Sequence, residues 1–445
     1  MTKLAKRAWF AYFLAAAMLV GVIVILVRYA VGAPDWMPFQ SNGLVVDRSG
    51  TMLMDNTDGK SELADDPTVR AAMLHILGDT QGYIAPYLLN EYGDEMSGYD
   101  RLTGTRHTGN SYGKMQLTVS AYAQAAAVYA FGGQKGTIGV YNYKTGEILC
   151  MVSSPTYDPR NVPDVAGNPD AYEGVYVNRF LHSAYAPGST FKLVTAAAAL
   201  SELNGIEDRV FHCDGSALIG DEVVICNAVH GDIGFREALC QSCNVAFAQI
   251  AQELGAEKLS RYADAFCIGK SLEFDGFITK KGNFDLSDAT TFEAAWAGVG
   301  QYTDQINPCQ YMTFMGAIAN GGEAATPYLV ESVTFGDTEQ YRVKQSTGGR
   351  ILDRKTADEL AEMMHYNVVN NYGEWYFCGL YAGAKSGTAE RGEGQAPNAL
   401  LAGFLRDEDY PLAFVVIVEG GGAGSTACTP IVRQVLEACI AAMDS

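Results

Sequence analysis

The sequence predicts an α+β fold in which an antiparallel sheet is built from both ends of the main domain, with helices on both sides of the sheet. Two apolar strands joined by a short turn are expected at 136–141 and 147–152, and three more at 380–384, 400–405 and 412–419. Between these groups the chain reads mainly as helix. Strands and helices that are segregated along the sequence are typical of the α+β class.

The first element in chain order is an apolar stretch, Ala8–Val27, which contains no charged residue. About 20 apolar residues are enough for a helix to cross a bilayer. Lys3, Lys6 and Arg7 precede the stretch and only Arg28 follows it closely. The positive-inside rule then predicts a single-pass anchor in the cell membrane, with the N-terminus in the cytoplasm and the rest of the chain outside.

Three segments are expected. Residues 1–32 form the cytoplasmic tail and anchor, residues 33–115 a small membrane-proximal domain or pedestal, and residues 116–445 the main domain. The chain has 445 residues, of which 48% are hydrophobic, so it is long and apolar enough for a substantial core. Its formal charge of −20 argues against a nucleic-acid partner, because binding phosphates requires a basic surface.

The middle of the main domain is expected to be helical. Pro187 and Gly188 indicate a turn, and Ser189 opens a helix whose next residues favour that conformation. Further helices are predicted at 238–253, 288–296, 308–318, 352–366 and 429–443.

The Ser189 helix carries the first sign of chemistry, because Lys192 stands one turn after Ser189 on the same face. A serine hydroxyl becomes a nucleophile when a base removes its proton. A lysine amine serves as that base if burial or a second cation lowers its pKa. Backbone N–H groups at the helix start would stabilise an oxyanion.

Two further motifs follow Ser189 in the order that serine acyl-transfer enzymes of the Ser-x-x-Lys type use. Ser242-Cys243-Asn244 is the only Ser-x-Asn in the chain, and Lys385-Ser386-Gly387 is the only Lys-Ser/Thr-Gly after Ser189. Two of the three motifs also have a second match: Ser111–Lys114 repeats Ser-x-x-Lys in a loop, and Lys144–Gly146 repeats Lys-Thr-Gly in a hairpin turn. We interpret both second matches as chance.

The residue types suggest a role for each position. Lys385 would help to keep Lys192 neutral and attract a substrate carboxylate. Ser242 would relay a proton, and Asn244 would hold a peptide amide through its donor and acceptor.

The strand that carries Lys385 is expected to bind the substrate. Gly387 would let a bound peptide lie close to the strand, the Ser386 and Thr388 hydroxyls would bind its carboxylate, and the N–H groups of Ser189 and Thr388 would form the oxyanion hole.

The chain resembles the class B penicillin-binding proteins, the membrane-anchored peptidoglycan D,D-transpeptidases, over most of residues 115–435. Besides the three motifs, the resemblance rests on the segments 144–149, 154–159 and 178–192 and on Gly300-Gln301. It implies the penicillin-binding, β-lactamase-like transpeptidase fold. It also implies catalysis by Ser189, Lys192, Ser242 and Asn244, with substrate bound by Lys385, Ser386, Gly387 and Thr388.

The resemblance implies a reaction without cofactor or metal. Ser189 attacks the penultimate D-Ala of a stem peptide, and an amine of a neighbouring stem takes the acyl group; β-lactams acylate the same serine. A glycan polymerase is the implied membrane partner. Two alternatives stay open: a D,D-carboxypeptidase, in which water is the acceptor, and a catalytically idle penicillin-binding scaffold of the wall-synthesis machinery.

Ten cysteines on an exported chain raise the question of disulfides. Cys213 and Cys226 flank a predicted hairpin and are a candidate pair. Cys240 and Cys243 form a Cys-x-x-Cys, which is found in zinc and redox sites. Because no histidine pair or second Cys-x-x-Cys accompanies it, we expect small buried hydrophobic side chains rather than a zinc site.

Overall fold

The computed structural model describes residues 3–32, 43–58, 60–100, 105–106, 111–392 and 394–445. Helix α1 (Lys3–Gly32) contains the predicted anchor, and its segment Arg7–Val27 is long and apolar enough to cross a membrane. The large hydrophobic side chains of this segment are exposed, from Trp9 to Val27. The first ten residues of the predicted pedestal, 33–42, lie outside the described residues.

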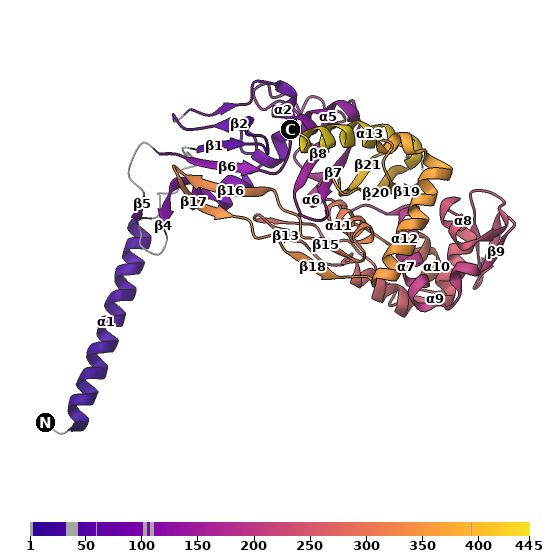
Figure 1. Ribbon diagram of the computed structural model, residues 1–445, viewed down its shortest axis with the longest axis horizontal. Helices are drawn as coiled ribbons and strands as arrows, with labels where there is room; N and C mark the ends of the chain where they lie inside the picture. Colours follow the sequence, from indigo (N-terminus) through magenta and orange to yellow (C-terminus); the bar gives the residue numbers. More distant parts are fainter. Residues whose placement is uncertain (1–2, 33–42, 59, 101–104, 107–110, 393) are drawn as a thin grey trace.

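The predicted antiparallel sheet is present and has five strands in the order β19-β20-β21-β7-β8, with every neighbouring pair antiparallel. Its strands come from two distant parts of the chain, as expected: β7 (Gly136–Asn142), β8 (Ile148–Ser154), β19 (Ala382–Ala389), β20 (Asn398–Leu405) and β21 (Leu412–Val418). Figure 1 shows α13 (Gly424–Met443) lying across this sheet.

Both faces of the sheet are buried, which explains why its strands read as continuous apolar runs. Alternate residues of β20 point to opposite faces. Leu401 belongs to the core formed with α13 and α5 (Ala121–Phe131), while Leu400 belongs to the core on the other face. The helices on the two faces therefore fix the register of each strand.

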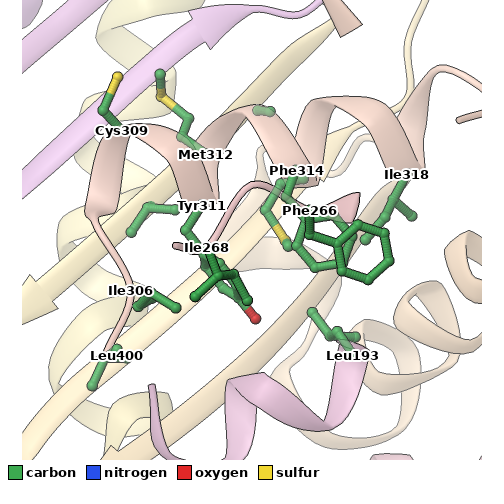
Figure 2. Packing of buried hydrophobic residues seen from close by; sticks show 14 of the residues in the cluster. Leu193, Phe266, Ile268, Ile306, Cys309, Tyr311, Met312, Phe314, Ile318 and Leu400 are labelled. Atoms are coloured by element: carbon green, nitrogen blue, oxygen red, sulfur yellow. The ribbon is translucent and has the colours of Figure 1, made fainter. Parts of the chain in front are cut away.

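The core on the second face is centred on α11 (Pro308–Ala319), whose N-terminus is capped by Asn307. Asn307 Oδ1 accepts the N–H of Cys309 at 3.1 Å. Figure 2 shows side chains of α11 in the same buried cluster as Leu400 of the sheet and Leu193 of α7 (Lys192–Glu202). This packing holds the start of α7, and hence Ser189, at a set distance from the sheet.

A second sheet has the order β17-β16-β6-β1-β2-β3. It pairs pedestal strands β1 (Gly43–Val46), β2 (Met52–Asp55), β3 (Glu62–Leu63) and β6 (Gly113–Leu117) with a hairpin formed by β16 (Val330–Phe335) and β17 (Thr338–Arg342). β1 is parallel to β6, whereas β16 is antiparallel to it. The hairpin therefore ties the main domain to the pedestal, and the boundary at residue 115 stays a prediction.

The remaining elements are short or cover the two sheets. The helices are α2 (Pro67–Leu77), α3 (Tyr87–Glu91), α4 (Gly93–Ser97), α6 (Arg179–His182), α8 (Phe235–Cys240), α9 (Asn244–Ala265), α10 (Thr291–Val299) and α12 (Arg354–Asn367). The strands are β4 (Tyr99–Asp100), β5 (Thr105–Arg106), β9 (Val210–Cys213), β10 (Ser216–Ile219), β11 (Glu222–Ile225), β12 (Gly231–Gly234), β13 (Glu273–Phe274), β14 (Phe277–Ile278), β15 (Glu323–Ala325) and β18 (Thr347–Arg350).

Three sequence expectations are wrong in detail. The helix predicted at 238–253 is broken between α8 and α9, because Ser242 takes a left-handed backbone conformation with φ +56°. The strand predicted to end at residue 384 continues through the Lys-Ser-Gly motif to Ala389. The helix predicted to open at Ser189 begins as a 3₁₀ turn, Gly188–Phe191, before α7.

Candidate active site

Ser189 lies in the tight turn that precedes α7 and is half-buried. Two hydrogen bonds hold this turn: Thr190 Oγ1 donates to the Pro187 carbonyl at 2.7 Å, and Tyr311 Oη donates to the Thr190 carbonyl at 2.8 Å. Gly188 has φ +53°, and a Cβ there would lie 2.5 Å from the Thr388 carbonyl oxygen. Glycine therefore lets the Ser189 turn approach β19.

Lys192 is completely buried beneath Ser189. Its Nζ lies 2.8 Å from Ser189 Oγ, 2.8 Å from Asn244 Oδ1 and 3.4 Å from Ser242 Oγ. One amine thus contacts the candidate nucleophile and both polar side chains of the second motif. The geometry matches a base held against a hydroxyl, with a second hydroxyl within reach for proton transfer.

The second motif forms the junction between α8 and α9 rather than part of one helix. Cys243 is the N-cap of α9 and Asn244 is its first residue. The left-handed conformation of Ser242 directs the motif toward the lysines, and Asn244 Nδ2 donates to the Ile225 carbonyl at 3.0 Å. A non-glycine residue in this conformation stores strain, which the surrounding contacts must hold.

Lys385 lies on β19 with its side chain 1% exposed. Its Nζ lies 3.1 Å from Ser242 Oγ and donates to the Ser386 carbonyl at 2.8 Å. Ser242 Oγ is therefore flanked by the amines of Lys192 and Lys385. Lys385 is buried although β19 is an edge strand, because its amine is directed at Ser242 in the α8–α9 junction.

Burial controls the protonation of both lysines. It lowers the pKa of Lys192 well below the ordinary value, and the charge of Lys385 lowers that pKa further. Burial lowers the pKa of Lys385 to about 7, with Cys240 acting weakly in the opposite direction. These pKa shifts agree with the expectation that Lys192 is the amine that loses its proton more readily. A pKa of about 7 also means that Lys385 is only partly charged at neutral pH.

The strand that carries Lys385 is an edge strand, and two residues that the sequence did not single out as site residues contact it. Tyr372 Oη accepts the Ser386 N–H at 2.9 Å and lies 3.0 Å from Ser386 Oγ. Gln301 Nε2 donates to the Thr388 carbonyl at 3.1 Å. Gly300-Gln301 belonged to the family resemblance, whereas Tyr372 is in a π-turn, Val368–Tyr372, that carries no recognisable motif.

Gly387 also has a packing role that the sequence did not reveal. A Cβ at this position would lie 2.7 Å from the Pro187 carbonyl oxygen and 3.0 Å from Thr190 Cγ2. The glycine lets the strand pack against the Ser189 turn. Thr388, the next residue, is exposed, so the four residues Lys385–Thr388 run from a buried amine to the open end of the site.

The structure separates the second matches from this site. Lys114 is exposed on β6 of the pedestal sheet, and Ser111 precedes that strand. Lys144 is exposed in the turn between β7 and β8. All eight predicted site residues instead lie on three adjoining elements: the Ser189 turn with α7, the α8–α9 junction and β19.

The penicillin-binding protein transpeptidase domain model matches residues 136–437, which include all of these elements. The chain belongs to this family. This penicillin-binding protein is 28% identical to peptidoglycan D,D-transpeptidase PbpA of Mycolicibacterium smegmatis over 365 residues, 74% of this chain and 72% of the relative.

Solved structures of penicillin-binding proteins share its fold. The D,D-transpeptidase domain of a peptidoglycan glycosyltransferase from Eggerthella lenta has a TM-score of 0.77 and 27% identity, and the match covers 90% of this chain and 98% of the other. The ceftriaxone acyl-enzyme of penicillin-binding protein A from M. tuberculosis has a TM-score of 0.77 and 23% identity, with 90% and 99% covered. The predicted α+β transpeptidase fold is therefore confirmed.

Proposed function

We propose that the chain is a peptidoglycan D,D-transpeptidase that cross-links stem peptides through a Ser189 acyl-enzyme. The observation that carries the proposal is the position of Lys192 Nζ, buried and 2.8 Å from both Ser189 Oγ and Asn244 Oδ1. The family and the name of the mycobacterial relative support the same reaction.

In the acylation step, neutral Lys192 accepts the Ser189 proton as Ser189 Oγ bonds to the carbonyl carbon of the penultimate D-Ala. The negative charge of the tetrahedral intermediate falls on the carbonyl oxygen, near the backbone N–H groups of Ser189 and Thr388. The proton then passes from Lys192 through Ser242 Oγ to the departing D-Ala amine as the peptide bond breaks. The two distances from Ser242 Oγ to the lysines, 3.4 and 3.1 Å, suit this relay.

Deacylation runs the same steps in reverse with a different amine. The amine of a neighbouring stem attacks the acyl-enzyme, and its proton passes through Ser242 to Lys192. Lys192 then gives this proton to Ser189 Oγ as the acyl–oxygen bond breaks, which restores the neutral amine and the free hydroxyl. Asn244 holds the stem-peptide amide, and Lys385 with the Ser386 and Thr388 hydroxyls binds the terminal carboxylate. A β-lactam carries the same carboxylate and amide and acylates Ser189 in the same way.

The proposal is tested by labelling the detergent-purified full chain with a fluorescent penicillin. We expect the parent and Ser111→Ala to be labelled alike and Ser189→Ala to carry no label, with the adduct mapped by mass spectrometry to the peptide that contains Ser189. Incubation with a stem pentapeptide and an acceptor amine should release D-Ala and form the cross-linked product. Release of D-Ala without cross-linking, at saturating acceptor, would identify a carboxypeptidase instead.

We also propose that α1 anchors the enzyme with its N-terminus in the cytoplasm and the catalytic domain outside. The apolar, exposed surface of Arg7–Val27 supports this anchor, and the three basic residues before Ala8 support its direction. A bulky, membrane-impermeant thiol reagent should label cysteines introduced after residue 40 on intact cells and none introduced before Arg7. Labelling of both ends from outside would contradict the topology.

We propose that a glycan polymerase binds in the membrane, since cross-linking needs newly made glycan strands. The aromatic residues Trp9, Phe10, Tyr12 and Phe13 of α1 are exposed, so they can contact a partner helix as well as lipid. A photoreactive residue at position 12 should cross-link to a polymerase in cells. Cross-links to lipid alone would contradict the partner.

A further inference from the structure

Four side chains that can bind metals meet beside the active site. Cys213 ends β9, Cys226 follows β11, His230 precedes β12, and Cys243 is the N-cap of α9. Their ligand atoms all lie within 4.8 Å of one another. All ten cysteines are among the described residues and none is in a disulfide, so the candidate pair Cys213 and Cys226 is not bonded.

Two distances within this cysteine–histidine cluster, both from Cys226 Sγ, fit ligands of one small ion. Cys226 Sγ lies 3.8 Å from Cys243 Sγ and 3.6 Å from His230 Nδ1. A tetrahedral zinc site with Zn–S bonds of about 2.3 Å and Zn–N bonds of about 2.0 Å has ligand–ligand edges of roughly 3.5–3.8 Å. The two distances match these edges.

We propose that Cys213, Cys226, His230 and Cys243 form a structural Zn²⁺ site. Four protein ligands close the coordination sphere, so the ion would take no part in the reaction. Each of the three thiols loses its proton to solvent as its sulfur–zinc bond forms, and neutral His230 binds through Nδ1. The charge of the resulting three thiolates exceeds that of the ion by one, which backbone N–H groups must offset.

Two such N–H groups are already directed at the sulfurs. The Asn244 N–H donates to Cys226 Sγ at 3.2 Å, and the Ala246 N–H donates to Cys243 Sγ at 3.4 Å. Both belong to the first turn of α9, whose dipole also favours negative charge. Donors that orient metal ligands in this way are common around zinc.

The site would stabilise the second catalytic motif. Cys243 stands between Ser242 and Asn244, and Cys226 follows Ile225, whose carbonyl accepts the Asn244 side-chain amide at 3.0 Å. An ion bound to both cysteines holds the β10–β11 hairpin against the α8–α9 junction. It thereby supports the left-handed backbone of Ser242, which is strained without its neighbours.

The sequence pattern explains why this site was not expected. The four ligands are spaced Cys-x₁₂-Cys-x₃-His-x₁₂-Cys, and the Cys-x-x-Cys pair contributes only Cys243. Cys240 ends α8 and is not part of the cluster. The β10–β11 hairpin and the pairing of β9 with β12 bring the other ligands together, and no local sequence pattern indicates that contact.

The first experiment measures bound metal. The full chain is purified in detergent with a tag that contains no histidine, and its zinc content is determined by elemental mass spectrometry. We expect one zinc per chain in the parent and in Cys267→Ser, which removes a half-buried cysteine elsewhere, and a loss of zinc in Cys226→Ser and His230→Ala. Cobalt exchanged into the parent should give the absorption of tetrahedral cobalt with thiolate ligands.

The second experiment does not depend on how the variants fold. Removal of zinc from the parent by a chelator should slow fluorescent-penicillin acylation by about tenfold or more, and added Zn²⁺ should restore it. This readout rests on the proposed function, whereas the metal content does not. A metal-free parent, whether its thiols are free or Cys226 is disulfide-bonded to Cys213 or Cys243, would overturn the site even if acylation is normal. Unchanged acylation after complete zinc removal would overturn its support of Ser242.

Discussion

Two regions of the molecule contain the same Ser-x-x-Lys pattern but differ in backbone conformation and in the burial of the lysine. At Ser189 the chain turns into a helix, so the serine and the lysine three residues later meet at 2.8 Å, with the amine buried. At Ser111 the chain forms no helix: Ser111 precedes β6, and Lys114 lies in that strand and is exposed.

The two Lys-Ser/Thr-Gly copies differ in the same way. Lys385 is buried in an edge strand and adjoins Ser242, whereas Lys144 is exposed in a turn whose N–H groups are bound by Asn142 Oδ1. The comparison teaches that burial and backbone geometry, rather than the pattern itself, make these residues reactive. Paired substitutions at the two copies test this directly.

The largest effect is expected for Lys192→Arg compared with Lys114→Arg. Arginine keeps the charge but does not deprotonate, so Lys192→Arg should acylate with penicillin at least roughly a thousandfold more slowly, near the upper range for loss of a general base. Lys114→Arg should match the parent. The second-order acylation rate measures both, with melting temperatures as the check on folding. Equal rates for Lys192→Arg and the parent would show that Lys192 is not the base.

A smaller loss, roughly ten- to a hundredfold, is expected for Lys385→Arg, because the cation that binds the carboxylate is kept while the larger side chain disturbs a buried position. Lys144→Arg is its control and should acylate normally. If Lys385→Arg is damaged more than Lys192→Arg at equal stability, the roles of base and carboxylate anchor are reversed.

The rate of acylation by a β-lactam should fall by about tenfold per pH unit on the alkaline side of its pH profile. Lys385 has a pKa near 7, so it is charged below that pH and loses its charge as pH rises through it. Acylation by a β-lactam carboxylate should therefore decline above about pH 7 in the parent. In Lys385→Arg the cation persists and the decline should be absent. A parent rate that keeps rising to pH 9 would contradict this role of the charge.

The smallest effect concerns the side chains that support the two Lys-Ser/Thr-Gly copies. Tyr372→Phe removes the acceptor of the Ser386 N–H, and Asn142→Ala removes the acceptor of the Lys144 and Thr145 N–H groups. Each should lower the free energy of unfolding by about 1–3 kcal/mol, as measured by denaturant melts. Only Tyr372→Phe should also slow acylation, by a few-fold. If Asn142→Ala slows acylation as much as Tyr372→Phe does, the acylation rate depends only on the stability of the protein.

The sequence was sufficient to predict the central sheet, because its strands are apolar, short and separated by turns. It was also sufficient to predict that the three motifs form one site, since their order and spacing match a known family. Local patterns did not reveal the break at Ser242, because the residues on both sides favour helix and the tertiary contacts of Lys192 and Ile225 decide the conformation. The burial of Lys385 and the meeting of Cys213 with Cys243 depend likewise on contacts between distant segments.

The pairing of β7 with β21 has a consequence for how the enzyme is made. Asn142 pairs with Leu412 and Gly136 with Val418, so the central sheet joins residues from the start and the end of the domain. A ribosome that adds residues one by one completes β7 long before β21 exists. The strand that packs against the Ser189 turn, β19, is connected to β7 only through β20 and β21, so it lacks its place in the sheet until almost the whole chain has been synthesised. The nascent protein has no assembled site for a β-lactam to acylate, and premature termination anywhere before β21 yields an inactive polypeptide.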